Sequence, residues 1–347
     1  MFHLPAEHSA VCRCASSGPA LCSSAQPSQR LLALQAPLAG PVVVHRYPRH
    51  HTLLHLLDDW RARPRPAVAA LVVATRGSSY RKPGALALID ETGLAAGCIS
   101  GGCLEVALVA DAHAVLAVGS ALRRSYDTRG DDDRWFGSQS GCRGTTDLLL
   151  WPGDAHHPLL TALAAADDAH RWLWVDADAL ECHETAAAGR VAIAPPPRLL
   201  LLGGGPEAPP LLTLAGTLGW RVDVVEHRAR YLADARLAAA RNCIAARPAA
   251  VVDSLRLARY DAAICASHLY DEDRCCLAAL ADSSLGFIGL LGPPSRRDEL
   301  LAELAAPARA RLDGRLEAPV GLALGAHGPE AVALAMLARL TQVFARG

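Results

Sequence analysis

The turn Gly203-Gly204-Gly205-Pro206-Glu207-Ala208 constrains the fold of this chain more than any other stretch. It fits the pattern G-x-G-x-x-A, with Pro206 suited to the first turn of the helix that we predict up to Leu218. An apolar strand over 198–202 precedes the turn, and a second strand over 221–225 delivers Glu226 where a dinucleotide-binding fold places its ribose-binding acid. This order predicts a Rossmann-type parallel sheet. The same turn also occurs in such folds without a nucleotide, so a purely structural role for the glycines stays an open alternative.

Later strands of the second half carry further polar residues to the same edge of the predicted sheet. A strand over 261–267 delivers His268, with Asp271 and Asp273 close behind, and a strand over 287–291 precedes a basic loop that contains Arg296. Open α/β sheets bind ligands at the carboxyl ends of their strands. Six residues are therefore candidate cofactor ligands, with structural roles as the alternative: Gly203, Gly205, Glu226, His268, Asp273 and Arg296.

The first half predicts a different, mixed sheet. An unbroken apolar run over 67–75 indicates a buried strand, 86–89 and 94–99 form a hairpin through Asp90-Glu91-Thr92-Gly93, and 146–151 is a further strand. The loop 76–84 between the first two strands carries three cations and two serine hydroxyls. Arg76 and Ser78 in this loop are candidates for binding an anionic ligand.

The stretch Ser100-Gly101-Gly102-Cys103-Leu104-Glu105 joins the hairpin to an apolar helix predicted over 104–118. Two glycines allow a backbone to approach a ligand closely. Cys103 falls at the helix N-terminus, where the free N–H groups favour a thiolate, which is the form that attacks and ligates. Ser100, Gly101 and Gly102 are candidate cofactor contacts and Cys103 a candidate reactive thiol, whereas the alternative is a buried cysteine after a tight turn.

A second glycine-cysteine loop precedes the strand 146–151, and it reads Gly141-Cys142-Arg143-Gly144. Gly141 and Gly144 are further candidate cofactor contacts and Cys142 a second candidate thiol. Two such loops and a cationic loop in one domain suggest a shared anion-binding or thiol site.

Composition places the chain in a broad class. Its 347 residues are 51% hydrophobic, which is enough for two domain cores. With 34 basic and 35 acidic residues, the chain has no excess of positive charge that would attract nucleic acid. Eleven dispersed cysteines, two of them adjacent, indicate reduced thiols. Without an apolar run of about 20 residues or a signal sequence, we expect a cytoplasmic protein with no membrane span. The expected domains are a weakly ordered extension (1–45), an N-terminal α/β domain (46–152), a connecting segment with a proline linker (153–197) and a Rossmann-like domain (198–347).

Taken together, these motifs resemble the XdhC/CoxI family of xanthine dehydrogenase accessory factors over about 50–347. In the first half the resemblance is carried by Thr75-Arg76-Gly77-Ser78, Pro83-Gly84-Ala85, Ser100-Gly101-Gly102-Cys103-Leu104-Glu105, Tyr126-Asp127 and Gly141-Cys142-Arg143-Gly144-Thr145. In the second half it is carried by Gly203-Gly204-Gly205, Leu218-Gly219-Trp220-Arg221-Val222, Ser267-His268, Asp273, Gly289-Leu290-Leu291-Gly292-Pro293 and Ala318-Pro319-Val320-Gly321-Leu322.

The resemblance implies an accessory factor rather than a stand-alone enzyme. Such a factor binds molybdenum cofactor (molybdopterin) transiently, protects it while a cysteine desulfurase supplies sulfur, and delivers it to a xanthine dehydrogenase-type molybdoenzyme. It also implies a homodimer. For such a function Cys103, alone or with Cys142, is a candidate either to contact molybdenum or to pass sulfur. The chain departs from the family pattern at Arg143, which stands where a glycine is usual, and at Glu317, which replaces a histidine.

Two other functions remain open from the residues alone. One is an NAD(P)-dependent oxidoreductase that uses Gly203 to Glu226, although His268 is its sole candidate catalytic residue. The other is a nucleotide-sensing or scaffold protein that recruits the desulfurase, with neither site catalytic.

Overall fold

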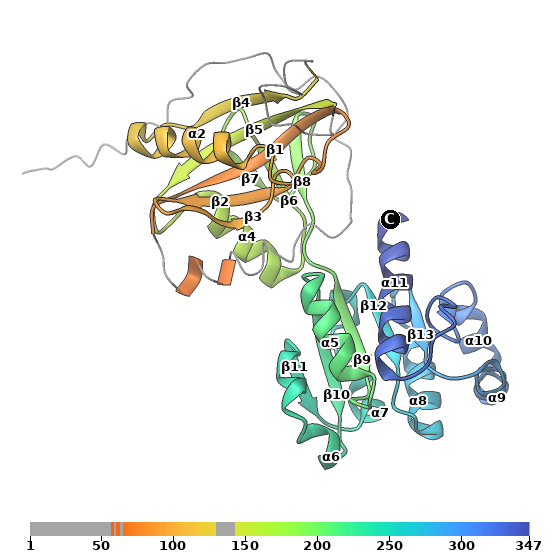
Figure 1. The fold of residues 1–347 in the computed structure, drawn as a ribbon. Coiled ribbons are helices and arrows are strands. Elements are labelled where there is room, and N and C mark those ends of the chain that lie inside the picture. Colours follow the sequence, from red (N-terminus) through yellow and green to blue (C-terminus); the bar gives the residue numbers. More distant parts are fainter. Residues whose placement is uncertain (1–56, 59, 63–64, 130–142, 347) are drawn as a thin grey trace, which may run out of the picture.

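The computed structural model describes residues 57–58, 60–62, 65–129 and 143–346, and Figure 1 shows two units that each contain their own sheet. Gly141 and Cys142 lie outside the described residues, as does the N-terminal extension. The described residues preceding the first strand include a helical stretch, at 57–58 and 60–62.

The N-terminal unit is built on a five-stranded antiparallel sheet in the order β3-β2-β1-β5-β4. The predicted core strands are confirmed, and β1 continues into Arg76 and Gly77, which we expected in the loop. The edge strand β4 was not expected, because its sequence is polar and half exposed. The strands are β1 (Ala67–Gly77), β2 (Leu86–Asp90), β3 (Gly93–Gly97), β4 (Leu122–Asp127) and β5 (Gly144–Gly153).

Separate layers cover the two faces of this sheet. Helix α2 (Glu105–Val118) packs Leu108, Ala112 and Val115 on one face. The other face shares a core with α4 (Pro158–Ala169) and with a small antiparallel sheet, β7-β6-β8. The segment that we expected as a looser connection therefore contributes to this core. Its strands are β6 (Leu173–Asp176), β7 (Glu181–His183) and β8 (Arg190–Ile193).

The C-terminal unit contains six parallel strands in the order β11-β10-β9-β12-β13-β14, which is the Rossmann order 3-2-1-4-5-6. The strand order reverses between β9 and β12, so the crevice of this fold lies at their carboxyl ends. The strands are β9 (Arg198–Leu202), β10 (Arg221–Glu226), β11 (Asn242–Ala245), β12 (Ala262–Cys265), β13 (Ile288–Leu290) and β14 (Leu316–Glu317).

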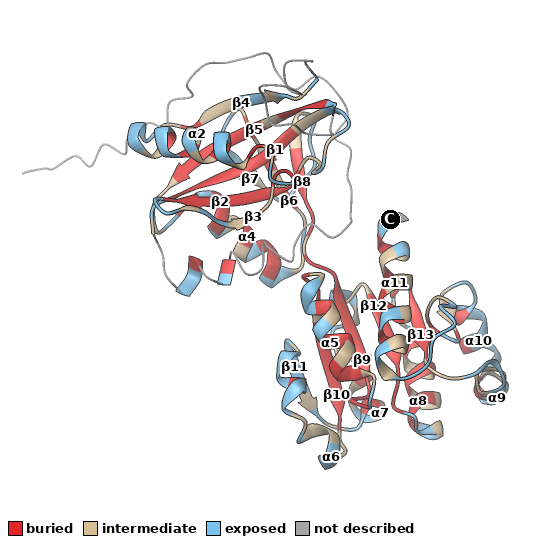
Figure 2. Cartoon of the chain, viewed as in Figure 1, coloured by how far each residue is buried: buried red, intermediate tan, exposed pale blue. Residues whose placement is uncertain are grey.

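Helices cover both faces of the parallel sheet, and Figure 2 shows its inner strands β10, β9, β12 and β13 as a buried layer between them. Helix α5 begins at Ala208, so Pro206 lies in the turn before it and Pro209 takes the first-turn position. The helices are α5 (Ala208–Thr217), α6 (Ala229–Leu232), α7 (Pro248–Val251), α8 (Tyr270–Ala281), α9 (Pro294–Glu303), α10 (Ala306–Leu312) and α11 (Pro329–Arg346). Short 3-10 turns occur at η1 (Ala235–Ala239), η2 (Val252–Ser254) and η3 (Leu257–Arg259).

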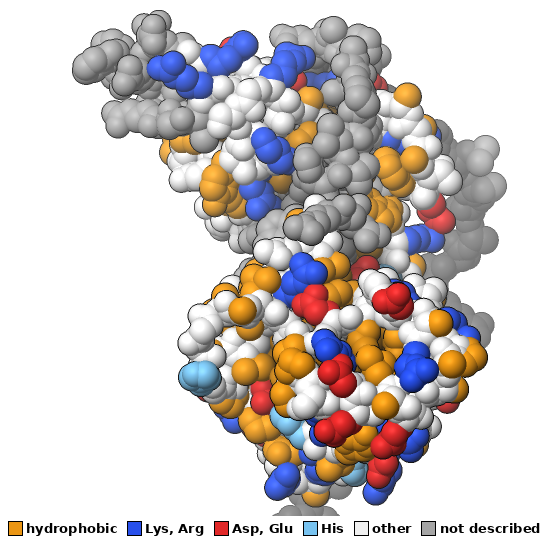
Figure 3. Space-filling view, turned by 90° about the vertical axis from the view of Figure 1, so that its right-hand side faces the viewer, with side chains coloured by type: hydrophobic (Ala, Val, Ile, Leu, Met, Phe, Trp, Pro, Cys, Tyr) orange, Lys and Arg blue, Asp and Glu red, His pale blue; other side chains and the backbone are white. Residues whose placement is uncertain are grey.

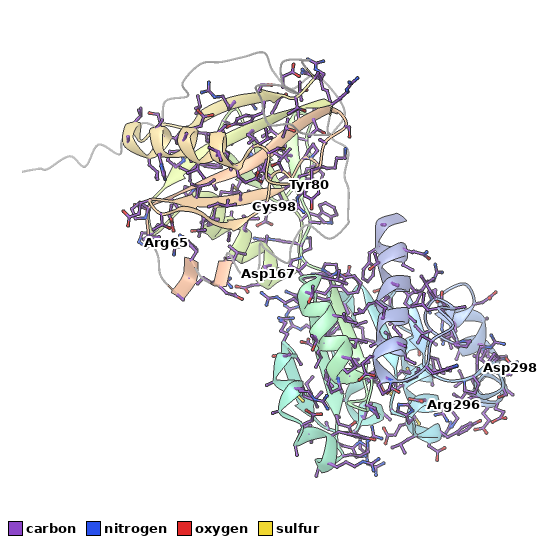
Figure 4. All side chains as sticks on the ribbon, viewed as in Figure 1. Arg65, Tyr80, Cys98, Asp167, Arg296 and Asp298 are labelled. Atoms are coloured by element: carbon purple, nitrogen blue, oxygen red, sulfur yellow. The ribbon has the colours of Figure 1, made fainter. Side chains whose placement is uncertain are left out.

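A buried polar contact joins the two units at the start of β9. The Arg198 side chain donates to the backbone oxygens of Asp167 and Asp168, and Arg221 donates to the Asp167 carboxylate at 2.8 Å. Figure 4 shows Asp167 at this joint. Because the amino ends of β9 and β10 face the first unit, the carboxyl edge of the parallel sheet points away from it.

No helix among the described residues has both the length and the apolar composition needed to cross a bilayer.

Candidate functional site

The described parts of the predicted loops in the N-terminal unit lie toward one end of its sheet. Antiparallel pairing places the end of β1, the start of β5 and the end of β4 side by side, with Gly77 opposite Gly144. The end of β3 lies beside the start of β2, since Cys98 N–H donates to Leu86 O. Figure 4 shows Cys98 and Tyr80 at this end of the sheet and Arg65 at the other. The cationic loop connects these two places: it starts after Gly77, which pairs with Gly144, and it brings Arg81 close enough to act on the Cys98 thiol.

Ser100 and Glu105 hold the Cys103 turn in place. The Ser100 hydroxyl donates to the Glu105 carboxylate and accepts from Gly102 N–H at 3.1 Å and Leu104 N–H at 3.0 Å. Glu105 also accepts from Ser100 N–H at 3.1 Å. These bonds satisfy alternate backbone donors, whereas the N–H groups of Gly101 and Cys103 have no acceptor among the described residues. The turn thus leaves two N–H groups without a described acceptor at the start of α2, while the Glu105 carboxylate binds the neighbouring N–H groups of Ser100 and Leu104.

Cys98 is a second thiol of this turn that sequence reasoning missed. Its Sγ donates to Ser100 O at 2.8 Å. Burial raises the pKa of the Cys98 thiol, and the Glu105 carboxylate raises it further against the opposing charge of Arg81. Cys98 therefore stays a protonated donor within the turn, while Cys103, half-buried, lies after the exposed Gly101 and Gly102. The predicted strand 94–99 placed Cys98 inside the hairpin, whereas β3 ends at Gly97 and Cys98 begins the turn.

The glycines at this end of the sheet serve two different purposes. A Cβ on Gly144 would lie 2.2 Å from Ser78 O and 2.6 Å from Arg76 O, and a Cβ on Gly77 would lie 2.7 Å from Arg143 O. These two glycines are required by the contact between β1 and β5. A Cβ on Gly101, in contrast, would meet no described atom within 4 Å, and its φ lies outside the left-handed region. The fold itself does not require glycine there, which favours close approach by a molecule from outside.

The cationic loop lines the same end. Arg76 and Ser78 are exposed at the end of β1, and Ser78 N–H donates to Arg143 O at 3.3 Å. Lys82 Nζ donates to Ser79 Oγ at 3.1 Å, which orders the middle of the loop. Tyr80 leaves 63% of its surface exposed beside these cations. Exposed positive charge and an exposed ring are what a ligand with both a phosphate and a flat heterocycle would contact.

The second group of predicted residues lies at the carboxyl edge of the parallel sheet, where the charged side chains of the group bind other residues of the chain. Ser267 Oγ donates to Asp273 Oδ1 at 2.6 Å, and Arg296 donates to Asp273 Oδ2 at 2.8 Å. His268, held at φ 60°, contacts Glu207 at 2.9 Å. Glu207 raises the pKa of His268, and His268 lowers the pKa of Glu207.

The two groups do not form one site within the chain. The amino ends of the parallel strands are at the joint, and the five residues of β9 then span roughly 16 Å before the glycine turn. Arg76, Ser78, Ser100, Gly101, Gly102 and Cys103 belong to the first group; Gly203, Gly205, Glu226, His268, Asp273 and Arg296 belong to the second. Among the described residues, no group of three or more His, Cys, Asp or Glu side chains could hold a metal ion.

The fold and this site define a class: a two-unit α/β protein with a cysteine-bearing glycine turn on an antiparallel sheet and a separate Rossmann domain. Figure 3 shows acidic and basic side chains intermixed over the visible face of the C-terminal unit, without a field of one sign.

The chain belongs to the XdhC and CoxI family. The model of that family matches residues 60–127, and the XdhC Rossmann domain matches residues 199–340. A Bacillus subtilis protein described as a probable subunit of xanthine dehydrogenase is 30% identical over 331 residues, which are 84% of this chain and 96% of that protein. The molybdenum cofactor insertion chaperone PaoD of Escherichia coli is 30% identical over 114 residues, 33% of this chain and 35% of PaoD.

A solved structure has the same fold. The crystal structure of a protein described as a xanthine dehydrogenase from Bacillus halodurans superposes with a TM-score of 0.70 at 27% identity, over 84% of this chain and 95% of that one. The match to both family models and to a full-length relative confirms the resemblance stated from the motifs.

Proposed function

We propose that this protein binds molybdenum cofactor at the loop end of its N-terminal sheet, assists sulfuration of the cofactor and passes it to a xanthine dehydrogenase-type molybdoenzyme. The observation that carries the proposal is Gly101. It is a glycine that the fold does not require, next to two free N–H donors and a half-buried thiol. The name of PaoD, a relative over a third of the chain, supports this chemistry.

Each chemical part of the cofactor has a complementary group at this end of the sheet. The phosphate suits the free N–H groups of Gly101 and Cys103 and the guanidinium of Arg76. The flat pterin suits the exposed ring of Tyr80. A soft cysteine thiolate suits molybdenum, so Cys103 is the residue that we assign to it.

Cys98 has a different role in this proposal. Its thiol is used inside the turn, where it donates to Ser100 O. Its raised pKa keeps it protonated, so it is not a competing ligand. Sulfuration then needs a cysteine desulfurase as the sulfur donor, and Cys103 holds the metal centre while the exchange takes place.

The test is the activity of the client enzyme. Cells that make molybdenum cofactor and a xanthine dehydrogenase-type client are supplied with the wild-type protein, with Cys103→Ala or with Cys243→Ala. Cys243 is an exposed thiol on β11 of the other unit, so its replacement controls for the loss of an accessible cysteine elsewhere in the chain. We expect the client enzyme to be desulfo and inactive in cells with Cys103→Ala, and active in cells with the wild type or Cys243→Ala.

Two results would count against the proposal. Full client activity with Cys103→Ala would show that the thiol has no part in maturation. Equal loss of activity with Cys243→Ala would show that the effect does not come from the N-terminal turn.

A further inference from the structure

The Rossmann fold of the C-terminal unit implies a nicotinamide dinucleotide, and such a ligand makes definite demands on the residues around it. In these folds the pyrophosphate binds at the N-terminus of the helix after the glycine turn, and an acid at the end of the second strand binds the ribose hydroxyls. Here the corresponding elements are the turn 203–205, helix α5 and Glu226 at the end of β10.

Glu226 has no free lone pair to offer a ribose. Its side chain is 1% exposed and accepts five hydrogen bonds. Three come from the backbone N–H groups of Gly204 (2.8 Å), His227 (2.8 Å) and Arg228 (2.7 Å). The Arg228 guanidinium donates the other two, at 2.9 and 2.6 Å. The acid therefore closes the glycine turn onto β10 instead of facing the crevice.

A second carboxylate occupies the position of the pyrophosphate. Glu207 is the residue directly before α5, and its Oε2 lies 3.4 Å from where a Cβ on Gly205 would stand. His268 holds it there from the opposite side of the crevice at 2.9 Å. A bound pyrophosphate would meet this negative charge at the start of α5, where Pro209 and Pro210 have no N–H and the N–H groups of Ala208 and Leu211 bond to backbone oxygens of the chain.

The glycines of the turn are explained without a ligand. A Cβ on Gly203 would lie 2.2 Å from Ala266 O, which reflects the close packing of β9 against β12. A Cβ on Gly204 would lie 3.0 Å from the Glu226 side chain, and one on Gly205 would lie 3.1 Å from the His268 ring. The chain's own atoms fill the space that a dinucleotide needs these glycines to leave open.

We propose that the Rossmann domain of this protein does not bind NAD or NADP, because the Glu207 and Glu226 side chains fill the dinucleotide site from within. The domain keeps the sheet and the turn of a nucleotide-binding fold, while its phosphate and ribose positions are used by intramolecular contacts. These contacts lie in the C-terminal unit, so a test of NAD or NADP binding there does not depend on whether the N-terminal turn binds molybdenum cofactor.

The test is a titration of the full chain with NADH, NADPH and ADP-ribose by isothermal calorimetry. We expect no saturation up to about 1 mM of any of these ligands. Saturable binding of any of them below about 100 µM that is lost in Glu226→Gln would overturn the proposal.

A variant tests the assigned role of Glu207. Glu207→Gln removes the charge from the turn, and we expect it to bind ADP-ribose at least tenfold more tightly than the wild type. Asp271→Asn is the matched control, because it removes one charge from the same edge at a side chain that is 89% exposed. If Glu207→Gln gains nothing, or if Asp271→Asn gains as much, Glu207 does not block the site. Thermal melting of each variant confirms that it is folded.

Discussion

Replacing Gly101 by alanine separates ligand binding from stability. No described atom lies within 4 Å of the new Cβ, and the backbone conformation is one that alanine can adopt. Because alanine restricts the unfolded chain more than glycine does, the free energy of unfolding is expected to stay the same or rise by about 0.4–1 kcal/mol. The methyl group, however, stands where we place the cofactor. We expect at least a tenfold loss of affinity, which corresponds to about 1.4 kcal/mol.

Gly144→Ala is the matched counterpart, with the same chemical change at the same end of the sheet. Its Cβ would lie 2.2 Å from Ser78 O, a backbone atom, so β1 and β5 have to move apart locally. Overpacking of this kind is expected to lower the free energy of unfolding by about 1–3 kcal/mol. The strain falls between β1 and β5, because Gly77 pairs with Gly144.

Urea unfolding and the cofactor content of protein purified without oxygen measure the two quantities separately. The expected pattern is a stable, cofactor-poor Gly101→Ala and a destabilised Gly144→Ala. If Gly101→Ala carries as much cofactor as the wild type, the glycine is not there for a ligand. If it unfolds as easily as Gly144→Ala, its role is structural and the reasoning from open space is wrong.

Three further predictions concern the joint, the crevice and the cationic loop. Asp167→Ala leaves Arg221 without its carboxylate partner and is expected to lower the free energy of unfolding by about 1–3 kcal/mol, measured in urea. Glu226, although buried, has a pKa lowered from 4.5 to about 2 by its hydrogen bonds from Arg228 and the backbone. Its stabilising contribution is therefore complete above pH 4.5 and is lost as the pH falls toward 2; Arg228→Ala should flatten this dependence in denaturation curves between pH 5 and pH 2.5. Arg76→Ala is expected to weaken binding of the cofactor and to reduce the dependence of its dissociation constant on salt concentration, and an unchanged salt dependence would remove Arg76 from the site.

The parallel sheet was predictable because its strands are apolar runs that end at recognisable turns. The order of an apolar run over 198–202, a glycine turn and a strand that ends at Glu226 is typical of a Rossmann-type sheet. The structure confirms both strands. The strands that the sequence did not reveal are short or half exposed. β4 contains Leu122-Arg123-Arg124-Ser125-Tyr126-Asp127, and β7 has only three residues, so neither has a periodic apolar pattern.

The sites were predictable to different degrees for a physical reason. Strand order places the Cys103 turn beside the cationic loop, and strand order follows from patterns along the chain. The pairing of His268 with Glu207 and of Glu226 with Arg228 depends on where side chains point, which a linear pattern does not record. Sequence patterns could therefore name Glu226 as a candidate ligand with a structural role as the alternative, but they could not show its bonds to Gly204 and Arg228.

The most direct test of the central claim is the cofactor content of the protein itself. The wild type, Cys103→Ala and Cys243→Ala are purified without oxygen from cells that make molybdenum cofactor, and pterin fluorescence after oxidation and molybdenum content are measured for each. We predict pterin and molybdenum in equal molar amounts in the wild type and in Cys243→Ala, and a loss of molybdenum from Cys103→Ala. Wild-type protein that contains neither pterin nor molybdenum would contradict the proposal that the N-terminal turn is a cofactor site.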